Sequence, residues 1–245
     1  MSFSNRLLVG LFCVLCIVLT AGCKQEEPIV EESDFCFDYT IAEVPYQSLQ
    51  NPTLLEYEDL NEDWVFDMPI GFDFPFCDSV FSDFHVVWDY SPTFRYEMEN
   101  GLAKRVGFEL FPYGRLSIGQ SLDGPLDGGW VGYETTGEAG NRVFTVEYNR
   151  VGLLKIIGEE QIPVTFQVQL RESNHSVSYH YGAHEVDFPL SELPYSRMFI
   201  GLLGADRNDG LHLHGNPANP QTYVKTDSIS MTYWPAQDTR YQFIQ

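Results

Sequence analysis

The stretch NRVFTVEYNRV, residues 141–151, decides the fold class because its side chains fall strictly into two alternating sets. The apolar set is Phe144, Val146 and Tyr148, and polar residues such as Glu147 take the positions between them. A period of two, with β-branched and aromatic residues on one side, predicts a half-buried β-strand. The stretch therefore predicts a sheet that buries one of its faces.

The same period continues outward from this stretch. It recurs in PVTFQVQLRE (163–172), HSVSYHYG (175–182) and RYQFIQ (240–245), while helical patterns are nearly absent. Loops rich in glycine and aspartate, such as DGPLDGG (123–129) and GADRNDG (204–210), separate the strand patterns. Many short strands between such turns predict an all-β fold, an antiparallel β-sandwich of jelly-roll-like form.

The N-terminus carries a targeting segment. Arg6 precedes an uncharged apolar run over 7–20, which is shorter than the about 20 residues that a membrane-spanning helix needs. The run ends in LTAGC (19–23), which resembles the bacterial lipobox. This resemblance implies that the signal peptide 1–22 is removed and that Cys23 is acylated, by palmitate among other chains. Two or more acyl chains hold a protein stably on a membrane.

The segment after the lipobox is predicted to be a short disordered tether. Residues 23–48 are acidic and contain a candidate first strand, and residues 49–245 form a single β-sandwich domain in this interpretation. The sequence Lys-Gln-Glu-Glu at 24–27 resembles the surface-export signal of Bacteroidota lipoproteins; the alternative is a merely solvated charged tether. We therefore expect a lipoprotein of the cell envelope, on the outer membrane and exposed at the cell surface if that signal operates.

Charge and cysteine content narrow the function classes. The formal net charge of −21 repels phosphate backbones, so no nucleic-acid partner is expected. Once Cys13 and Cys16 leave with the signal peptide and Cys23 carries lipid, Cys36 and Cys77 remain. An exported pair favours a disulfide, and two separate buried thiols are the alternative.

Five fragments, read in order, carry a family resemblance. They are MPIGFDFPFCDSVFSDFHV (68–86), GYETTGEAGNRVFTVEYNRV (132–151), VTFQVQLRESNHSVSYHYG (164–182), IGLLG (200–204) and YWPAQDTRYQF (233–243). Together they resemble the β-sandwich modules of surface and secreted Bacteroidota proteins, and more distantly the nidogen-type extracellular module. The resemblance implies an extracellular setting and a binding or accessory role, and it implies no reaction. Residues 87–113 depart from the pattern of these modules.

Two groups of residues are weak metal candidates. His212 and His214 would face the same side of a strand and could approach one zinc ion, although no cysteine cluster joins them. Asp206, Asn208 and Asp209 form an oxygen-rich turn that could hold a structural calcium, but no bidentate glutamate follows at the distance of a calcium loop. Ordinary turn formation explains the second group equally well, and no cofactor is expected.

Glycan recognition is the remaining chemical hypothesis. Trp130 is predicted to lie on a glycine-rich loop with Tyr133 close by, which would make an exposed aromatic platform for a sugar. The alternative is that Trp130 covers the core from this loop. Glu185 and Asp187 begin an E-x-D-x-x-E pattern of jelly-roll hydrolases, but Leu190 stands where the third acid belongs. We therefore expect a non-catalytic binding or structural module whose partner is a glycan or another envelope protein. The alternative is a glycan-active or metal-dependent jelly-roll enzyme.

Overall fold

The computed structural model describes most of the chain, and all the described residues lie between Glu31 and Gln245. Cys23 and the candidate calcium residues Asp206, Asn208 and Asp209 lie outside the described residues. The described ranges are 36–56, 65–87, 92–93, 95–99, 102–109, 116–117, 128–154, 161–192, 200–203, 210–223 and 231–245.

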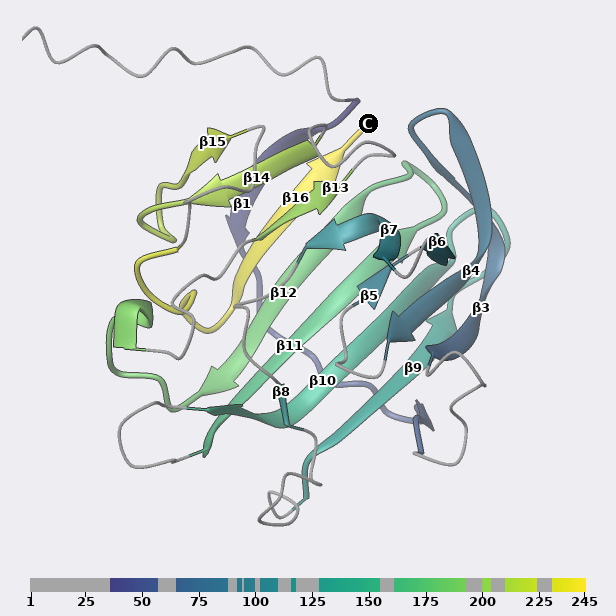
Figure 1. Ribbon diagram of the computed structural model, residues 1–245. Coiled ribbons are helices and arrows are strands. Elements are labelled where there is room, and N and C mark those ends of the chain that lie inside the picture. The colour runs from purple at the N-terminus through teal and green to yellow at the C-terminus, as the bar shows by residue number, and fades with distance from the viewer. Residues whose placement is uncertain are drawn as a thin grey trace, which may run out of the picture. The chain divides into compact units, whose positions relative to one another are not determined.

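The largest sheet has the strand order β1-β16-β12-β11-β10-β9-β2, with β8 paired to β10, and every pairing in it is antiparallel (Figure 1). Its central strands β10, β11 and β12 are those that the sequence alternation predicts. The strands are β1 (Asp38–Glu43), β2 (Thr53–Leu54), β8 (Leu116–Ser117), β9 (Trp130–Thr136), β10 (Val143–Leu154), β11 (Gln161–Arg171), β12 (Val177–His184) and β16 (Thr239–Ile244).

Two smaller antiparallel sheets complete the described strands. The five-stranded sheet has the order β15-β14-β13-β7-β6, and the three-stranded sheet has the order β3-β4-β5. Their strands are β3 (Val65–Phe76), β4 (Ser79–Val87), β5 (Pro92–Thr93), β6 (Arg95–Glu99), β7 (Leu102–Glu109), β13 (Ile200–Leu203), β14 (Gly210–His214) and β15 (Gln221–Tyr223).

The helical content of the described residues is small. The 3₁₀ turn η2 (Leu190–Glu192) is three residues long, and the described part of the chain holds no helix with the length and apolarity to span a bilayer. The antiparallel sheets pack as a sandwich-like fold, so the prediction of an all-β antiparallel sandwich is confirmed.

One face of the large sheet forms the core. Phe144, Val146 and Tyr148 on β10 are fully buried, as their alternation predicts. The Tyr148 ring stacks on the Phe166 ring of β11, with centroids 4.5 Å apart. On the same face the Tyr179 hydroxyl donates a hydrogen bond to the Gly201 carbonyl of β13, so the five-stranded sheet packs on this side. We call this the inner face.

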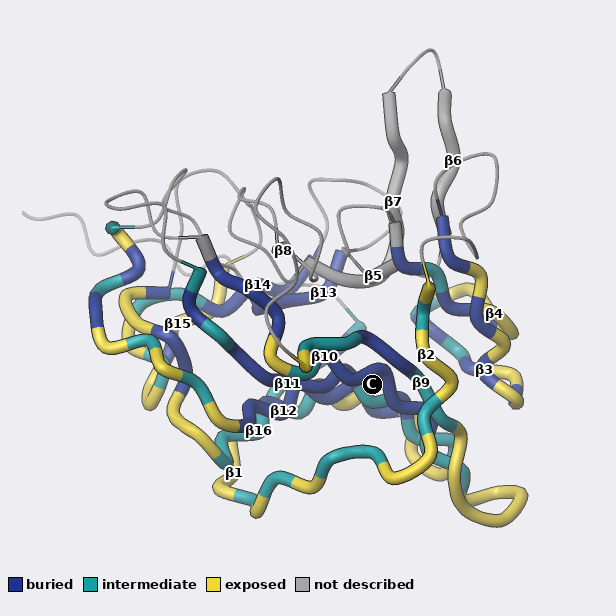
Figure 2. Tube along the Cα trace, turned by 90° about the horizontal axis from the view of Figure 1, so that it is seen from below, coloured by how far each residue is buried: buried dark blue, intermediate teal, exposed yellow. Residues whose placement is uncertain are grey.

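The opposite, outer face is crossed by the chain itself. β1 lies at one edge of the large sheet and β2 lies at the other edge. Residues 44–52, which we call the strap, connect these two strands and run along the side of the sheet away from β13 and β14 (Figure 2). The strap lacks regular secondary structure, so its backbone groups need partners from the sheet.

The N-terminal end of the described chain is held at two points. β1 lies within the segment 23–48 and pairs with β16, so the sheet includes part of the segment interpreted from sequence as a tether with a candidate first strand. Cys36 and Cys77 form a disulfide with Cα atoms 5.6 Å apart, which closes a loop of 41 residues. The bond joins the start of β1 to the turn between β3 and β4.

Candidate functional site

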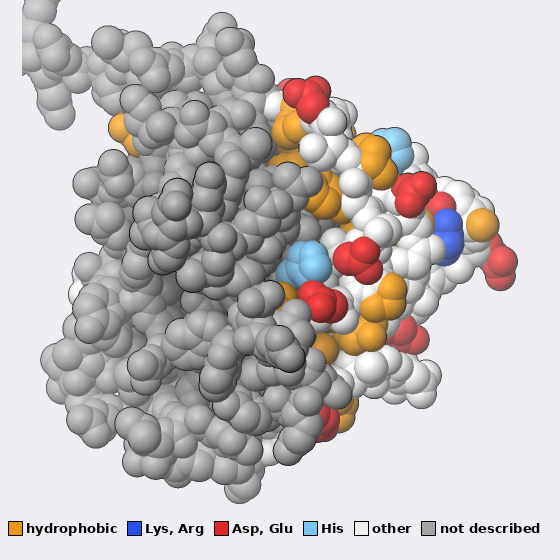
Figure 3. Space-filling view, turned by 45° about the vertical axis from the view of Figure 1, so that its right-hand side comes forward, with side chains coloured by type: hydrophobic (Ala, Val, Ile, Leu, Met, Phe, Trp, Pro, Cys, Tyr) orange, Lys and Arg blue, Asp and Glu red, His pale blue; other side chains and the backbone are white. Residues whose placement is uncertain are grey.

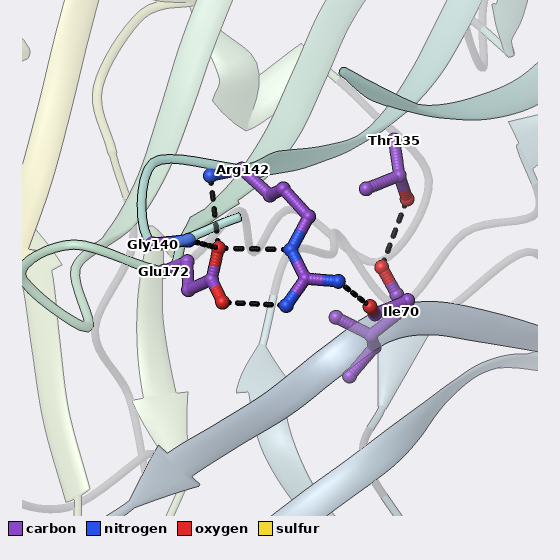
Figure 4. Close-up of polar contacts among 6 residues, drawn as sticks. Ile70, Thr135, Gly140, Arg142 and Glu172 are labelled. Carbon is purple, nitrogen blue, oxygen red and sulfur yellow. Dashed lines mark hydrogen bonds and ion pairs between the residues drawn. The ribbon is translucent and has the colours of Figure 1, made fainter. Parts of the chain in front are cut away.

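A connected polar cluster surrounds Arg142, at the start of β10 (Figure 4). Its guanidinium donates from Nε to Glu172 Oε2 at 2.9 Å and from Nη2 to Glu172 Oε1 at 2.6 Å. The same carboxylate accepts the N–H groups of Gly140 (2.8 Å) and Arg142 (3.0 Å). The remaining guanidinium nitrogen donates to the Gly71 carbonyl. We call these residues the Arg142 cluster.

The Arg142 cluster joins the β3–β4 hairpin to the large sheet. Gly71 has a φ of 86°, a conformation that favours glycine, and β3 has a register shift against β4 here. Thr135 Oγ1 of β9 donates to the Ile70 carbonyl at 2.8 Å, next to the Arg142 contact. Three of the sequence fragments that carry the family resemblance therefore meet at one point, where their polar groups serve the fold.

Charge reinforces this cluster. Hydrogen bonds from the Arg142 side chain lower the pKa of Glu172 to about 2, and the N–H groups of Arg142 and Gly140 add to the effect. The same side-chain bond raises the pKa of Arg142. Because both groups stay ionised and bind each other, the Arg142 cluster offers no proton donor or acceptor for catalysis.

A buried carboxylate lies under the strap. Glu147 on β10 is fully buried and points to the outer face. It accepts hydrogen bonds from the Leu49 N–H (2.6 Å), the Asn149 Nδ2 (2.9 Å), the Gln167 Nε2 (3.0 Å) and the Ser48 hydroxyl. Four donors satisfy this carboxylate, which explains how a glutamate can be buried there.

Further side chains continue this contact along the strap. His180 on β12 hydrogen-bonds through Nε2 to the Val44 carbonyl at 2.8 Å. Asp238 Oδ1 accepts the Tyr46 N–H at 2.8 Å, and Gln167 Nε2 also donates to the Gln47 carbonyl at 2.8 Å. Burial lowers the pKa of His180, so the imidazole is kept neutral. These polar side chains hold a chain segment rather than an open site.

One pocket of about 340 Å³ opens between two turns near the C-terminus. Trp234 forms a wall and is buried, and its ring lies edge-on to the Tyr181 ring with centroids 5.7 Å apart. The described residues provide no hydrogen-bond partner for Trp234 Nε1 or the Tyr181 hydroxyl. The pocket is mostly apolar and is lined by His184, Pro217, Ala218, Trp234, Ala236, Gln237 and Thr239.

The predicted aromatic platform is not assembled. Trp130 is the first residue of β9 rather than a loop residue, and it pairs with Asn149 on the outer face. Tyr133 pairs with Val146 and contacts the Phe144 ring, with centroids 6.0 Å apart, on the inner face. An odd spacing along a strand places side chains on opposite faces, so these two rings do not form one surface for a sugar.

The predicted metal and acid residues do not form a cluster of three or more ligands in the described part of the chain. His212 is buried and His214 packs against the Tyr223 ring, with centroids 6.0 Å apart. Within the described ranges, no group of three His, Cys, Asp or Glu side chains could hold a metal ion. Glu185 and Asp187 are exposed just after β12.

The exposed side of the β3–β4 hairpin is acidic. Asp67, Asp73 and Asp83 are exposed, and Asp67 contacts His85 Nδ1 at 2.7 Å. Acidic side chains are spread over the described surface that Figure 3 turns forward. This agrees with the net charge and indicates a solvated surface rather than a site of defined chemistry.

The strap contacts are the feature that sequence reasoning missed. Alternation placed Glu147 on the polar face of its strand, which normally means exposure to solvent. The signal that could have revealed its burial is the unusual run of polar residues on that face, in particular Gln167 and His180, together with a segment long enough to cross the sheet.

A family model described as NIDO-related matches residues 37–245. It therefore covers the described strands from β1 to β16, including the disulfide partner Cys77 but not Cys36. No curated protein and no solved structure matches the chain.

Proposed function

Since the chain belongs to the NIDO-related family, whose domain suggests an extracellular binding or structural module, we propose that it is a non-catalytic lipoprotein of the bacterial cell envelope. In this proposal Cys23 carries the lipid anchor on the outer membrane, and the folded domain binds a glycan or another envelope protein. In this proposal the anchor residue Cys23 precedes residues 37–245, which the family model matches.

The non-catalytic part of the proposal rests on one observation: the buried or paired carboxylates bind other parts of the fold. Glu147 binds the strap through Leu49 and Ser48, and Glu172 binds Arg142. A general acid or base must reach a substrate proton. Each of these carboxylates instead has its oxygens occupied by donors of the fold itself.

The anchor part rests on the sequence LTAGC (19–23) after an apolar run. An acyl anchor suits an acidic domain, because the buried methylene groups hold the chain while the domain stays in water. The disulfide fits export, since such bonds persist in oxidising compartments.

Labelling tests the anchor in the native host. With an alkyne analogue of palmitate, the unchanged chain should be labelled and recovered with membranes. Cys23→Ser should lose the label and leave the membrane fraction. Cys16→Ser is the matched control, because it removes a nearby cysteine from the apolar run and should leave labelling intact. An unlabelled chain, or a label that Cys23→Ser retains, contradicts the proposal.

Protease treatment of intact cells tests the surface location. If the segment 24–27 acts as an export signal, added protease should cleave the domain, and replacing these four residues with alanine should protect it. Protection of the unchanged chain would place the domain on the periplasmic side and leave the anchor proposal intact.

A further inference from the structure

Two arginines and a serine lie on a diagonal across the outer face of the large sheet. Ser178 on β12 is opposite Gln169 on β11, and Arg171 is the next residue on the same face of β11. On the other side, His180 is opposite Arg240 of β16. Ser178 is therefore midway between the two arginines in the sheet register.

Two hydrogen-bonding groups along this diagonal have no partner among the described residues. Ser178 is fully buried, and its hydroxyl has no hydrogen-bond partner among the described residues. Arg240 Nε is enclosed as well, and it too has no partner in the described part of the chain. Among the described residues the Arg171 side chain makes one hydrogen bond, a long one of 3.4 Å from Nη2 to Gln169 Oε1.

The cations also lack a counter-charge. Neither guanidinium forms an ion pair with a carboxylate in the described ranges. Asp238, two residues before Arg240, accepts the Tyr46 N–H of the strap instead. The guanidinium of Arg171 is half-buried; burial, followed by repulsion from Arg240, lowers its pKa, so the two charges lie close enough to interact.

Each missing partner is an acceptor or a negative charge. Buried donors are normally satisfied, and two neighbouring guanidiniums match the oxygens of sulfate, phosphate or carboxylate groups. The net charge of −21 disfavours an extended anionic surface such as a flat bilayer as the partner.

We propose that Arg171, Ser178 and Arg240 form a binding site for an oxyanion group carried by a small or chain-like ligand, such as a sulfated, phosphorylated or carboxylated glycan. The inference rests on the binding role proposed above and gives it a ligand class. It does not depend on Cys23, so loss of the lipid anchor would leave it standing.

Calorimetric titration of the purified full-length chain with inorganic phosphate and with sulfate, at constant ionic strength, tests the site. We expect saturable binding that Arg171→Gln and Arg240→Gln each weaken about tenfold or more. Arg150→Gln is the matched control, because Arg150 is an exposed arginine of the same sheet. Equal binding by all variants, or no binding by the unchanged chain, overturns the proposal.

A second variant, Ser178→Asp, should remove binding without lowering stability. In Ser178→Asp, a carboxylate stands between the two guanidiniums and takes the place of the ligand. We expect it to abolish phosphate binding while the urea midpoint rises or stays level. If the midpoint instead falls, the added carboxylate does not reach the two guanidiniums and is buried without a partner, which overturns the proposal.

The source of the oxyanion is distinguished by vesicles containing phosphatidylglycerol. We expect the Cys23→Ser chain, which lacks the lipid anchor, to bind free phosphate and not to bind these vesicles. Binding to vesicles that the two arginine substitutions abolish, without binding of free phosphate, would overturn the commitment to a glycan-type ligand.

Discussion

Arg142 and Glu172 meet side by side, with Nε–Oε2 and Nη2–Oε1 distances of 2.9 Å and 2.6 Å. The pair joins the start of β10 to the turn after β11, and its guanidinium also reaches the β3 backbone at Gly71. Two parallel hydrogen bonds between planar groups fix orientation as well as distance. The β3–β4 hairpin therefore has its place on the large sheet set by this pair.

The pair makes stability depend on pH in a defined window. The pKa of Glu172 is about 2 in the folded chain and 4.5 as the ordinary value. A lowered carboxyl pKa contributes stability that is full above pH 4.5 and is lost as pH falls toward 2. We expect Glu172→Gln to lower the urea midpoint at pH 7, and the difference from the unchanged chain to shrink across this window. Glu138→Gln is the control, because Glu138 is an exposed acid in the turn before β10. It should not change the urea midpoint or its dependence on pH.

Glu147 holds the strap on the sheet, so its removal should loosen that segment. Glu147→Ala leaves four donors without their acceptor, and we expect a loss of about 3 kcal/mol in the free energy of unfolding. Hydrogen exchange followed by mass spectrometry should be faster in Glu147→Ala than in the unchanged chain, and this increase should be larger in residues 44–52 than elsewhere.

Glu134→Ala is the matched control for this variant. Glu134 lies on the same face, one strand away on β9 and opposite Thr145, and is only half-buried. It should change neither the unfolding free energy nor exchange in the strap. Unchanged exchange in Glu147→Ala would mean that β1 and β2 hold the strap without help from the carboxylate.

Sequence reasoning succeeded where the argument was local. Alternation placed Phe144, Val146 and Tyr148 on a buried face because strand geometry requires it. It failed where the cause was distant. The burial of Glu147 depends on a segment about a hundred residues earlier, and the separation of Trp130 from Tyr133 depends on β9 beginning at Trp130. The residues next to Glu147 do not reveal its burial; the available signal was Gln167 and His180 on the neighbouring strands.

The disulfide between Cys36 and Cys77 should stabilise the domain through the unfolded chain. A closed loop of 41 residues removes conformational freedom from that state, equivalent to about 4 kcal/mol in the chain-entropy model. We expect Cys36→Ser, or reduction by dithiothreitol, to lower the unfolding free energy by up to this amount. The reductant should have no further effect on Cys36→Ser. An additional loss there would show that reduction acts on something other than this bond.

His212 should produce a second pH effect, at higher pH than Glu172. Its ring packs closely against Gly201 and Gly210, since an added Cβ at either glycine would lie 2.8 Å from a ring nitrogen. Burial lowers the pKa of His212 from 6.5 to about 4. Between these values the unfolded chain binds a proton that the folded chain does not. Stability is therefore full above pH 6.5 and falls by about 3 kcal/mol as pH drops to 4.

Urea unfolding at several pH values measures this effect as the change in unfolding free energy per pH unit, rather than as a single midpoint. His212→Gln removes the titrating group, and we expect its unfolding free energy to vary less between pH 6.5 and 4 than that of the unchanged chain, whatever its absolute stability. His175→Asn is the control, because His175 is exposed and has a φ of 53°, which asparagine tolerates. It should keep the full slope. If His212→Gln keeps the slope as well, the proton is taken up elsewhere, and the buried imidazole is not the cause of the acid sensitivity.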